Sequence, residues 1–309
     1  MIDIRTLVSS IILFTALAIP GYILGRKNLV NGSESVGLSN ILTMVAIPGL
    51  VLSKLLETNI IKLGLINLFA CVVVPVISTA ALGIITKVVF KNKYGANVKR
   101  ICSIFQNGGF LCIPLAQMTF PDNPEIVAYV SITNIFGVFL MLTYGEYLLS
   151  GDLSDVKPLK ILKKPIFWAI VIGSILSAFE INIPILVKFS GYIADLTTPL
   201  AMIVLGIQLS NFKIVKIFTE KSVYSVSFIQ LILTPVFTFI LLKLLQPFVS
   251  ANFIVGAFLL SAVPTASAIP AMASAANADA NLAAKITLGC TLFFTVTMPF
   301  MSILFDWIF

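Results

Sequence analysis

The chain has 309 residues, of which 59% are hydrophobic and 11% are charged, and its formal net charge is +7. Soluble domains carry about 45–50% apolar and about 25% charged residues, so this composition excludes an ordinary soluble domain, a disordered chain, a coiled coil and a disulfide scaffold. The mean hydropathy of +1.06 agrees with this. The sequence therefore predicts a polytopic membrane protein.

The sequence contains no histidine, which excludes His-ligated zinc, Ser-His-Asp catalysis and a histidine proton relay. We find no Ser/Lys, paired Asp or Cys constellation at one depth, so we predict no enzyme, no metal site and no cofactor. The basic residues lie in short loops between apolar segments, which argues against nucleic acid as a partner. The cysteines lie in apolar stretches without a CxxC pair and are interpreted as small buried residues: Cys71, Cys102, Cys112 and Cys290.

A helix needs about 20 apolar residues to cross a bilayer, and the chain contains ten such segments. The first segment is interpreted as a membrane span and not as a signal peptide, because no small-residue cleavage pattern follows it. The predicted spans are 7–25, 36–56, 63–90, 99–120, 125–149, 165–182, 190–211, 222–246, 251–277 and 283–308. We therefore expect an all-α fold of ten transmembrane helices in a lipid bilayer.

Most of the Lys and Arg residues lie in the connections that follow the odd-numbered spans. By the positive-inside rule these connections are cytoplasmic, which places both termini outside the cell membrane. The longest polar connection, 151–164, is then a cytoplasmic linker between a first five-helix repeat, 1–150, and a second one, 165–309. Because each half has an odd number of spans, the two halves have opposite orientations in the membrane, which predicts an inverted repeat.

Prolines recur in the same order at corresponding mid-span places of the two halves. The pairs are Pro48 and Pro199, Pro75 and Pro235, and Pro114 and Pro270. Proline removes a backbone donor and clashes with the carbonyl four residues back, so we interpret the repeat as a pattern of helix breakers. In lipid, freed backbone groups are tolerated only inside the protein or along a wet cavity. Paired broken helices in inverted repeats are typical of the binding site of a secondary transporter.

Span four contains two glycines and a proline within seven residues: Gly108, Gly109 and Pro114. Gln106 and Asn107 bring amide side chains to the same depth. Glycine lets the chain unwind and lets a ligand approach the backbone. The N-terminus of the half-helix that follows suits an anion, and Asn107 can both donate and accept hydrogen bonds. The alternative is a kinked packing helix with glycine at a helix contact.

Span nine contains two prolines six residues apart, Pro264 and Pro270, among small residues. Thr265 and Ser267 can either satisfy carbonyls that the break frees or reach a ligand. Small residues let another helix cross closely, so we expect spans four and nine to cross with Asn107 near the Pro264–Pro270 segment. Tight helix packing alone is the alternative interpretation.

The remaining polar residues within spans are weaker candidates. Asn134 in span five, Gln208 in span seven and Gln230 in span eight either line a path through the protein or form interhelical hydrogen bonds. Neither 99–120 nor 251–277 contains an acidic residue, which argues against a carboxylate proton relay but not against sodium bound by carbonyls and hydroxyls. Charged residues near span ends are expected to snorkel and are assigned no chemistry: Lys54, Glu57, Glu146, Glu180, Asp195 and Lys243.

With these residues identified, the chain resembles the auxin efflux carrier family in its short bacterial form. The closest pieces are 107–115, 199–209, 263–279 and 295–299, and the resemblance covers essentially the whole chain. It implies a fold shared with the bile-acid/sodium symporter group, in which spans 1, 2, 6 and 7 form a scaffold. Spans 3–5 and 8–10 then form a transport unit that moves like an elevator, with broken spans 4 and 9 crossing at the substrate site.

The resemblance also implies a function. Plant members export auxin, an indole carboxylate, and bacterial members are associated with malate, malonate and similar carboxylates, so we expect a transporter of small organic anions. A sodium-coupled symporter and a non-transporting membrane receptor are the alternatives. By position, Asn107 and Pro114 match the span-four crossover and Pro264 matches the span-nine crossover. The second proline of span nine, Pro270, departs from the pattern and leaves open which of the two prolines marks the crossing. A homodimer through the scaffold spans is implied by analogy alone.

Overall fold

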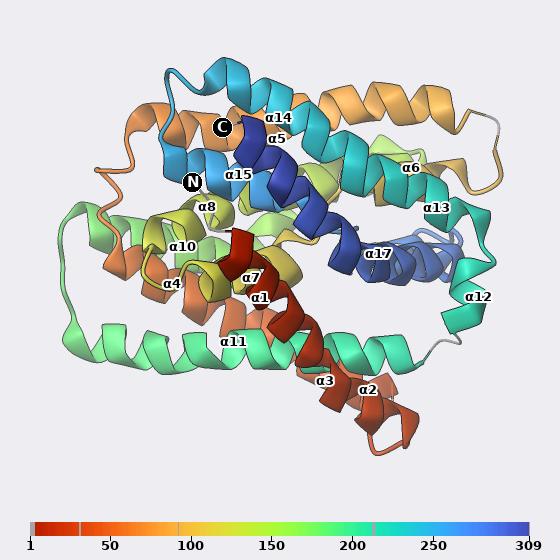
Figure 1. Cartoon of the computed structure of the whole chain (residues 1–309), viewed down its shortest axis with the longest axis horizontal. Helices are drawn as coiled ribbons and strands as arrows, with labels where there is room; N and C mark the ends of the chain where they lie inside the picture. Colours follow the sequence, from red (N-terminus) through yellow and green to blue (C-terminus); the bar gives the residue numbers. More distant parts are fainter. Residues whose placement is uncertain (1–3, 31, 92, 212–213, 309) are drawn as a thin grey trace.

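The computed structural model describes residues 4–30, 32–91, 93–211 and 214–308. Every named element in these ranges is a helix, which confirms the predicted all-α class (Figure 1). Seven helical segments are long and apolar enough to cross a membrane, and three apolar helices are shorter. The predicted position of the two termini concerns residues 1–3 and 309, which lie outside the described residues.

The seven long segments contain both single helices and helices joined through π-helical turns. In chain order they are α1 (Ile4–Ala16) with α2 (Ala18–Arg26); α3 (Gly32–Ile41), η1 (Leu42–Ala46) and α4 (Ile47–Glu57); α5 (Leu65–Val89); α8 (Pro124–Leu140), η3 (Met141–Gly145) and α9 (Glu146–Ser150); α11 (Pro184–Ser210); α13 (Lys221–Phe228), η6 (Ile229–Leu233) and α14 (Thr234–Leu245); and α17 (Ala280–Ile308).

The shorter elements complete the described chain. They are α6 (Ala96–Ile104), η2 (Gly108–Cys112) and α7 (Ile113–Thr119); the 3-10 turns η4 (Leu153–Asp155) and η5 (Pro158–Lys163); α10 (Pro165–Ala178); α12 (Ile214–Phe218); α15 (Ala251–Ala262); and α16 (Ile269–Ala275). Each of the ten predicted spans coincides with helix, but 99–120 and 251–277 are each divided in two. The inverted relation of the two halves stays a prediction.

Several helix boundaries differ from the sequence-based prediction, and two of them have a clear local cause. The sixth span was expected to reach residue 182, but α10 ends at Ala178 because Glu180 adopts a left-handed backbone conformation with φ +53°. The seventh span was expected to begin at 190, but α11 begins at Pro184. Proline suits the first turn of a helix because the backbone N–H it lacks would have no partner there.

Not every mid-span proline breaks its helix, which corrects the interpretation of the repeat. Pro75 and Pro199 lie inside the unbroken helices α5 and α11. Pro48 and Pro235 each follow a π-helical turn, η1 and η6, and the helix then continues. One missing N–H leaves only one carbonyl without its donor, which a widened turn or a slight bend can absorb.

Spans one and seven touch backbone to backbone. A Cβ atom added to Gly206 would clash with the backbone of Ala18 and Tyr22, and one added to Gly21 would clash with the backbone of Ile203. Glycine therefore allows the close approach, as small residues do between membrane helices. Figure 1 shows α11 running along one edge of the molecule, with the first helices packed against it.

The outer faces of the helices expose large apolar side chains, as α5 illustrates. Leu65, Phe69 and Val88 are mostly exposed, whereas Cys71 and Leu82 on the same helix are fully buried. A soluble monomer rarely exposes so much contiguous apolar surface. In a bilayer these side chains face lipid.

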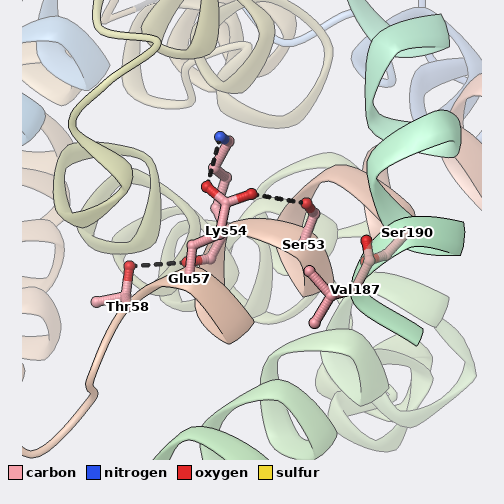
Figure 2. Close-up of polar contacts among 6 residues, drawn as sticks. All are labelled: Ser53, Lys54, Glu57, Thr58, Val187 and Ser190. Carbon is pink, nitrogen blue, oxygen red and sulfur yellow. Dashed lines mark hydrogen bonds and ion pairs between the residues drawn. The ribbon is translucent and has the colours of Figure 1, made fainter. Parts of the chain in front are cut away.

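Lys54 near the end of α4 does not snorkel, contrary to the expectation from its position. Its side chain is only 9% exposed, and its Nζ lies 2.8 Å from a carboxylate oxygen of Glu57. The hydroxyl of Ser53 donates to the other oxygen of Glu57 at 3.2 Å, and the hydroxyl of Thr58 donates to the carbonyl of Lys54 (Figure 2). The carboxylate one turn away neutralises the ammonium group, so the lysine can remain inside the protein.

Candidate functional site

Spans four and nine are both interrupted, and the interrupted segments pair with each other. The N–H of Asn107 donates to the carbonyl of Pro264 at 2.7 Å, and the N–H of Ala266 donates to the carbonyl of Phe105 at 3.0 Å. These two bonds form an antiparallel bridge. These bonds place Asn107 beside the Pro264–Pro270 segment, as the sequence predicts.

Side chains satisfy further backbone groups that the breaks set free. The buried hydroxyl of Thr265 donates to the carbonyl of Cys102 at 2.7 Å, at the end of α6. The amide of Gln230 donates to the carbonyl of Val263 at 3.2 Å, at the end of α15. Of the two roles predicted for Thr265, the structure shows the first: its hydroxyl satisfies a backbone carbonyl that the break frees. Gln230 likewise forms an interhelical hydrogen bond.

The three prolines of the crossing have different positions. Pro270 is the second residue of α16, which follows the break of span nine, whereas Pro114 is the second residue of α7, which continues the half-helix from the π-helical turn η2. Pro264 lies in the crossing segment itself, where its carbonyl accepts the hydrogen bond from Asn107. Pro264 therefore marks the span-nine crossing, and Pro270 begins the next half-helix.

A cavity of about 710 Å³ extends from the crossing to the linker. It contains most of the predicted site residues, which come from spans four, five and nine: Gln106, Asn107, Gly108, Gly109, Asn134 and Ser267. The other predicted site residues are not part of its lining: Pro114, Pro264, Thr265 and Pro270. Those four shape the crossing instead.

Several amide groups at the end of the cavity next to the crossing, called its inner end, are free to bind a ligand. Within the described part of the chain, the side chains of Gln106 and Asn134 have no hydrogen-bond partner. The hydroxyl of Ser267 lies 3.5 Å from Oδ1 of Asn107, which is at the limit of a hydrogen bond. A Cβ atom on Gly108 would clash with the side chain of Asn134, so this glycine brings spans four and five together.

The end of the cavity next to the linker, called its outer end, is charged. Lys157, Lys160 and Lys164 of the linker region line it, together with Glu146 of α9. Glu146 was expected to snorkel without a chemical role, but both of its carboxylate oxygens bind Nζ of Lys160, at 2.8 and 2.9 Å. The charged groups among the described lining residues therefore give the cavity a net positive charge.

Two kinds of lining residue were missed by the sequence analysis. The linker lysines were considered only as indicators of orientation, because nothing in a linker sequence shows that it folds back over a cavity. Asn40 and Thr43 of span two also line the cavity. Asn40 is the one asparagine in the predicted span 36–56, which is the signal that could have identified it.

Comparisons with known proteins identify the family of the chain. Residues 6–158 and 152–302 match the family Mem_trans, described as membrane transport protein. A relative from Methanothermobacter thermautotrophicus, described as an uncharacterized transporter, is 25% identical over 298 residues, which cover 93% of this chain and 94% of the relative. The resemblance to the auxin efflux carriers is thereby confirmed. The chain belongs to the membrane transport protein family.

Proposed function

We propose that the protein is a secondary transporter of small organic anions, above all carboxylates. The observation that carries the proposal is the composition of the cavity. Its inner end offers uncharged amides at the crossing, and its outer end carries three lysines against one glutamate. Such a cavity attracts an anion by its net charge and contains no carboxylate at the crossing, among its described residues, that would repel one.

The crossing provides donors for a carboxylate. The amides of Gln106, Asn107 and Asn134 can donate hydrogen bonds to it. The half-helix that starts at Gly108 has no side-chain cap, and Gly108 and Gly109 line the cavity. The positive end of the dipole of this half-helix therefore faces the bound anion. Charge-assisted hydrogen bonds of this kind are the strong ones.

Alternating access would follow from movement of the crossing against the scaffold. The cavity lies between span two and the crossing, so its walls belong to both of the expected units. The two hydrogen bonds of the bridge tie spans four and nine together, which suits movement as one body. The cavity opens toward the linker, and the distribution of Lys and Arg assigns that side to the cytoplasm of a cell-membrane protein.

Transport in proteoliposomes tests the proposal. We expect uptake of at least one of labelled malate, malonate and indole-3-acetate, and a higher unfolding temperature in its presence, because a ligand that binds only the folded state stabilises it. The absence of flux for every carboxylate, together with an unchanged unfolding temperature, would contradict the proposal. A raised unfolding temperature without flux would favour the receptor alternative.

The variant Asn107→Ala tests the site itself. It removes a donor to a charged ligand, so we expect initial uptake to fall about tenfold or more, with normal expression. Asn97→Ala is the matched control, because Asn97 lies in α6, just before the predicted span four, is exposed and is not part of the cavity lining. Equal uptake by the two variants would remove Asn107 from the site.

Sodium coupling is a second candidate, favoured by buried oxygens near the crossing. Within the described residues, Oε1 of Gln230 and Oγ1 of Thr287 are buried and have no hydrogen-bond partner. They lie on η6 and α17, which pack against each other. Oxygen atoms of this kind suit a hard cation. Uptake that disappears when sodium is replaced by potassium would establish coupling, and unchanged uptake would exclude it.

A further inference from the structure

The linker turn η5 is fixed to α10. The indole N–H of Trp168 donates to the carbonyl of Leu162 at 2.8 Å, and the N–H of Phe167 donates to the carbonyl of Lys164 at 3.0 Å. Only Lys164 separates the turn from Pro165, the first residue of α10. Lys160 is therefore held by span six, which belongs to the expected scaffold.

Glu146 belongs to the body that contains the crossing. It is the first residue of α9, which continues span five. The helix α9 packs against α6 and α16, the helices before the break in span four and after the break in span nine. A displacement of the crossing relative to span six would therefore separate Glu146 from Lys160.

The ion pair between Glu146 and Lys160 is well placed to resist that displacement. Nζ of Lys160 lies 2.8 and 2.9 Å from the two carboxylate oxygens, and the Glu146 side chain is only 16% exposed. Partial burial strengthens the attraction beyond that of a fully exposed pair. Ile161 also packs against Ile135 and Leu142 of span five, but apolar contacts lack direction and can slide.

We propose that the pair Glu146–Lys160 is a latch that stabilises the state in which the cavity is open toward the linker. The latch rests on the proposed movement of the crossing against the scaffold. Breaking the pair lowers the population of the open state and leaves Lys160 free to meet an entering anion. The pair thus connects the linker, which lies outside the spans, with access to the crossing.

Cysteine labelling measures this population without any substrate. Ala271 on α16 lines the cavity and is exposed, so Ala271→Cys reports whether the cavity is open. The four native cysteines are buried and give little background. The reagent is an uncharged, membrane-impermeant maleimide, applied to sealed vesicles that expose the linker side, as verified with Ser154→Cys in the exposed linker.

We expect Lys160→Gln and Glu146→Gln to slow the labelling of Ala271→Cys about threefold to fivefold, although they change the charge in opposite directions. Lys157→Gln is the matched control, because it is the same substitution at the same end of the cavity and no ion pair is recorded for Lys157 among the described residues. The exchanged pair Glu146→Lys with Lys160→Glu should restore the original labelling rate.

Two outcomes would overturn the latch. One is an unchanged labelling rate in both single variants, and the other is an equal effect of Lys157→Gln, which would indicate a general effect of charge. The result is independent of the transported substrate. A shifted labelling rate without flux of any carboxylate would support the latch and contradict the proposed substrate class, whereas flux with an unchanged labelling rate would do the reverse.

Discussion

Two kinds of proline-containing span differ in how the backbone around the proline is satisfied. In α5 and α11, Pro75 and Pro199 lie within continuous helices. In spans four and nine, Pro114 and Pro270 follow true interruptions, and the interrupted segments bond to each other. A single proline leaves one carbonyl without its donor, whereas an interruption of several residues frees groups on both sides.

The comparison shows that a helix interrupted inside a membrane needs a second segment to satisfy its free backbone groups. Unpaired backbone groups cannot turn to water within a bilayer. Span four supplies the groups that span nine lacks, and Thr265 and Gln230 satisfy two more carbonyls. The amide side chains that line the cavity are therefore not needed to satisfy the backbone and can bind a ligand.

A side chain added beside the break of span four should have the largest effect on stability and transport. Gly108→Ala places a Cβ atom against the side chain of Asn134 and 2.7 Å from a methyl carbon of Leu260. Such overpacking costs about 1–3 kcal/mol, so we expect a lower unfolding temperature and the loss of transport. The control Gly109→Ala meets no atom closer than 3.6 Å and should change the unfolding temperature little. Equal behaviour of the two variants would refute the close contact at Gly108.

Removing one side chain that supports the backbone should lower the stability by a similar amount, but without placing an atom in the space beside the break. Thr265→Val keeps the shape of the side chain but leaves the buried carbonyl of Cys102 without its donor, which costs about 1–3 kcal/mol. In the control Thr291→Val, the lost bond goes to the carbonyl of Thr287 four residues back in the same helix, so we expect less than about 0.5 kcal/mol. Thermal unfolding in detergent compares the two. A larger loss in Thr291→Val would disprove the special role of the break.

The unbroken helices should tolerate the loss of their prolines. Pro199→Ala restores a backbone N–H inside α11, so we expect an equal or slightly higher unfolding temperature, within about 1 kcal/mol. Pro270→Ala should be slightly destabilising, by less than about 1 kcal/mol, because proline restricts the unfolded chain at the start of a helix. A large drop in the unfolding temperature of Pro199→Ala would contradict the continuous helix at this proline.

Much of the fold could be predicted because span length and hydropathy are local properties. The breaks were also predictable, since Gly108, Gly109 and Pro114 cluster in one span and Pro264 and Pro270 in another. The sequence could not show which hydroxyl satisfies the backbone and which lines the cavity. Thr265 binds a carbonyl while Ser267 lines the cavity, and the choice depends on which helix end lies nearby in three dimensions.

The charged end of the cavity could not be predicted for a related reason. Lys160 and Glu146 are 14 residues apart, across a turn at Gly151 that adopts φ +76°. Their meeting requires η5 to fold back against span five, where Ile161 becomes buried. Tertiary contacts of this kind leave no periodic signal in the sequence.

The π-helical turns η1 and η6 change how these spans should be engineered. Each such turn contains one residue more than an α-helical turn, so the helix faces before and after it are offset by about 100°. A helical wheel drawn through the whole of span two or span eight therefore assigns one half to the wrong side. Deleting one residue within either turn should give a regular α-helical turn and leave both halves of the span facing as they do, whereas deleting one residue elsewhere in the span rotates the half that follows by about 100°.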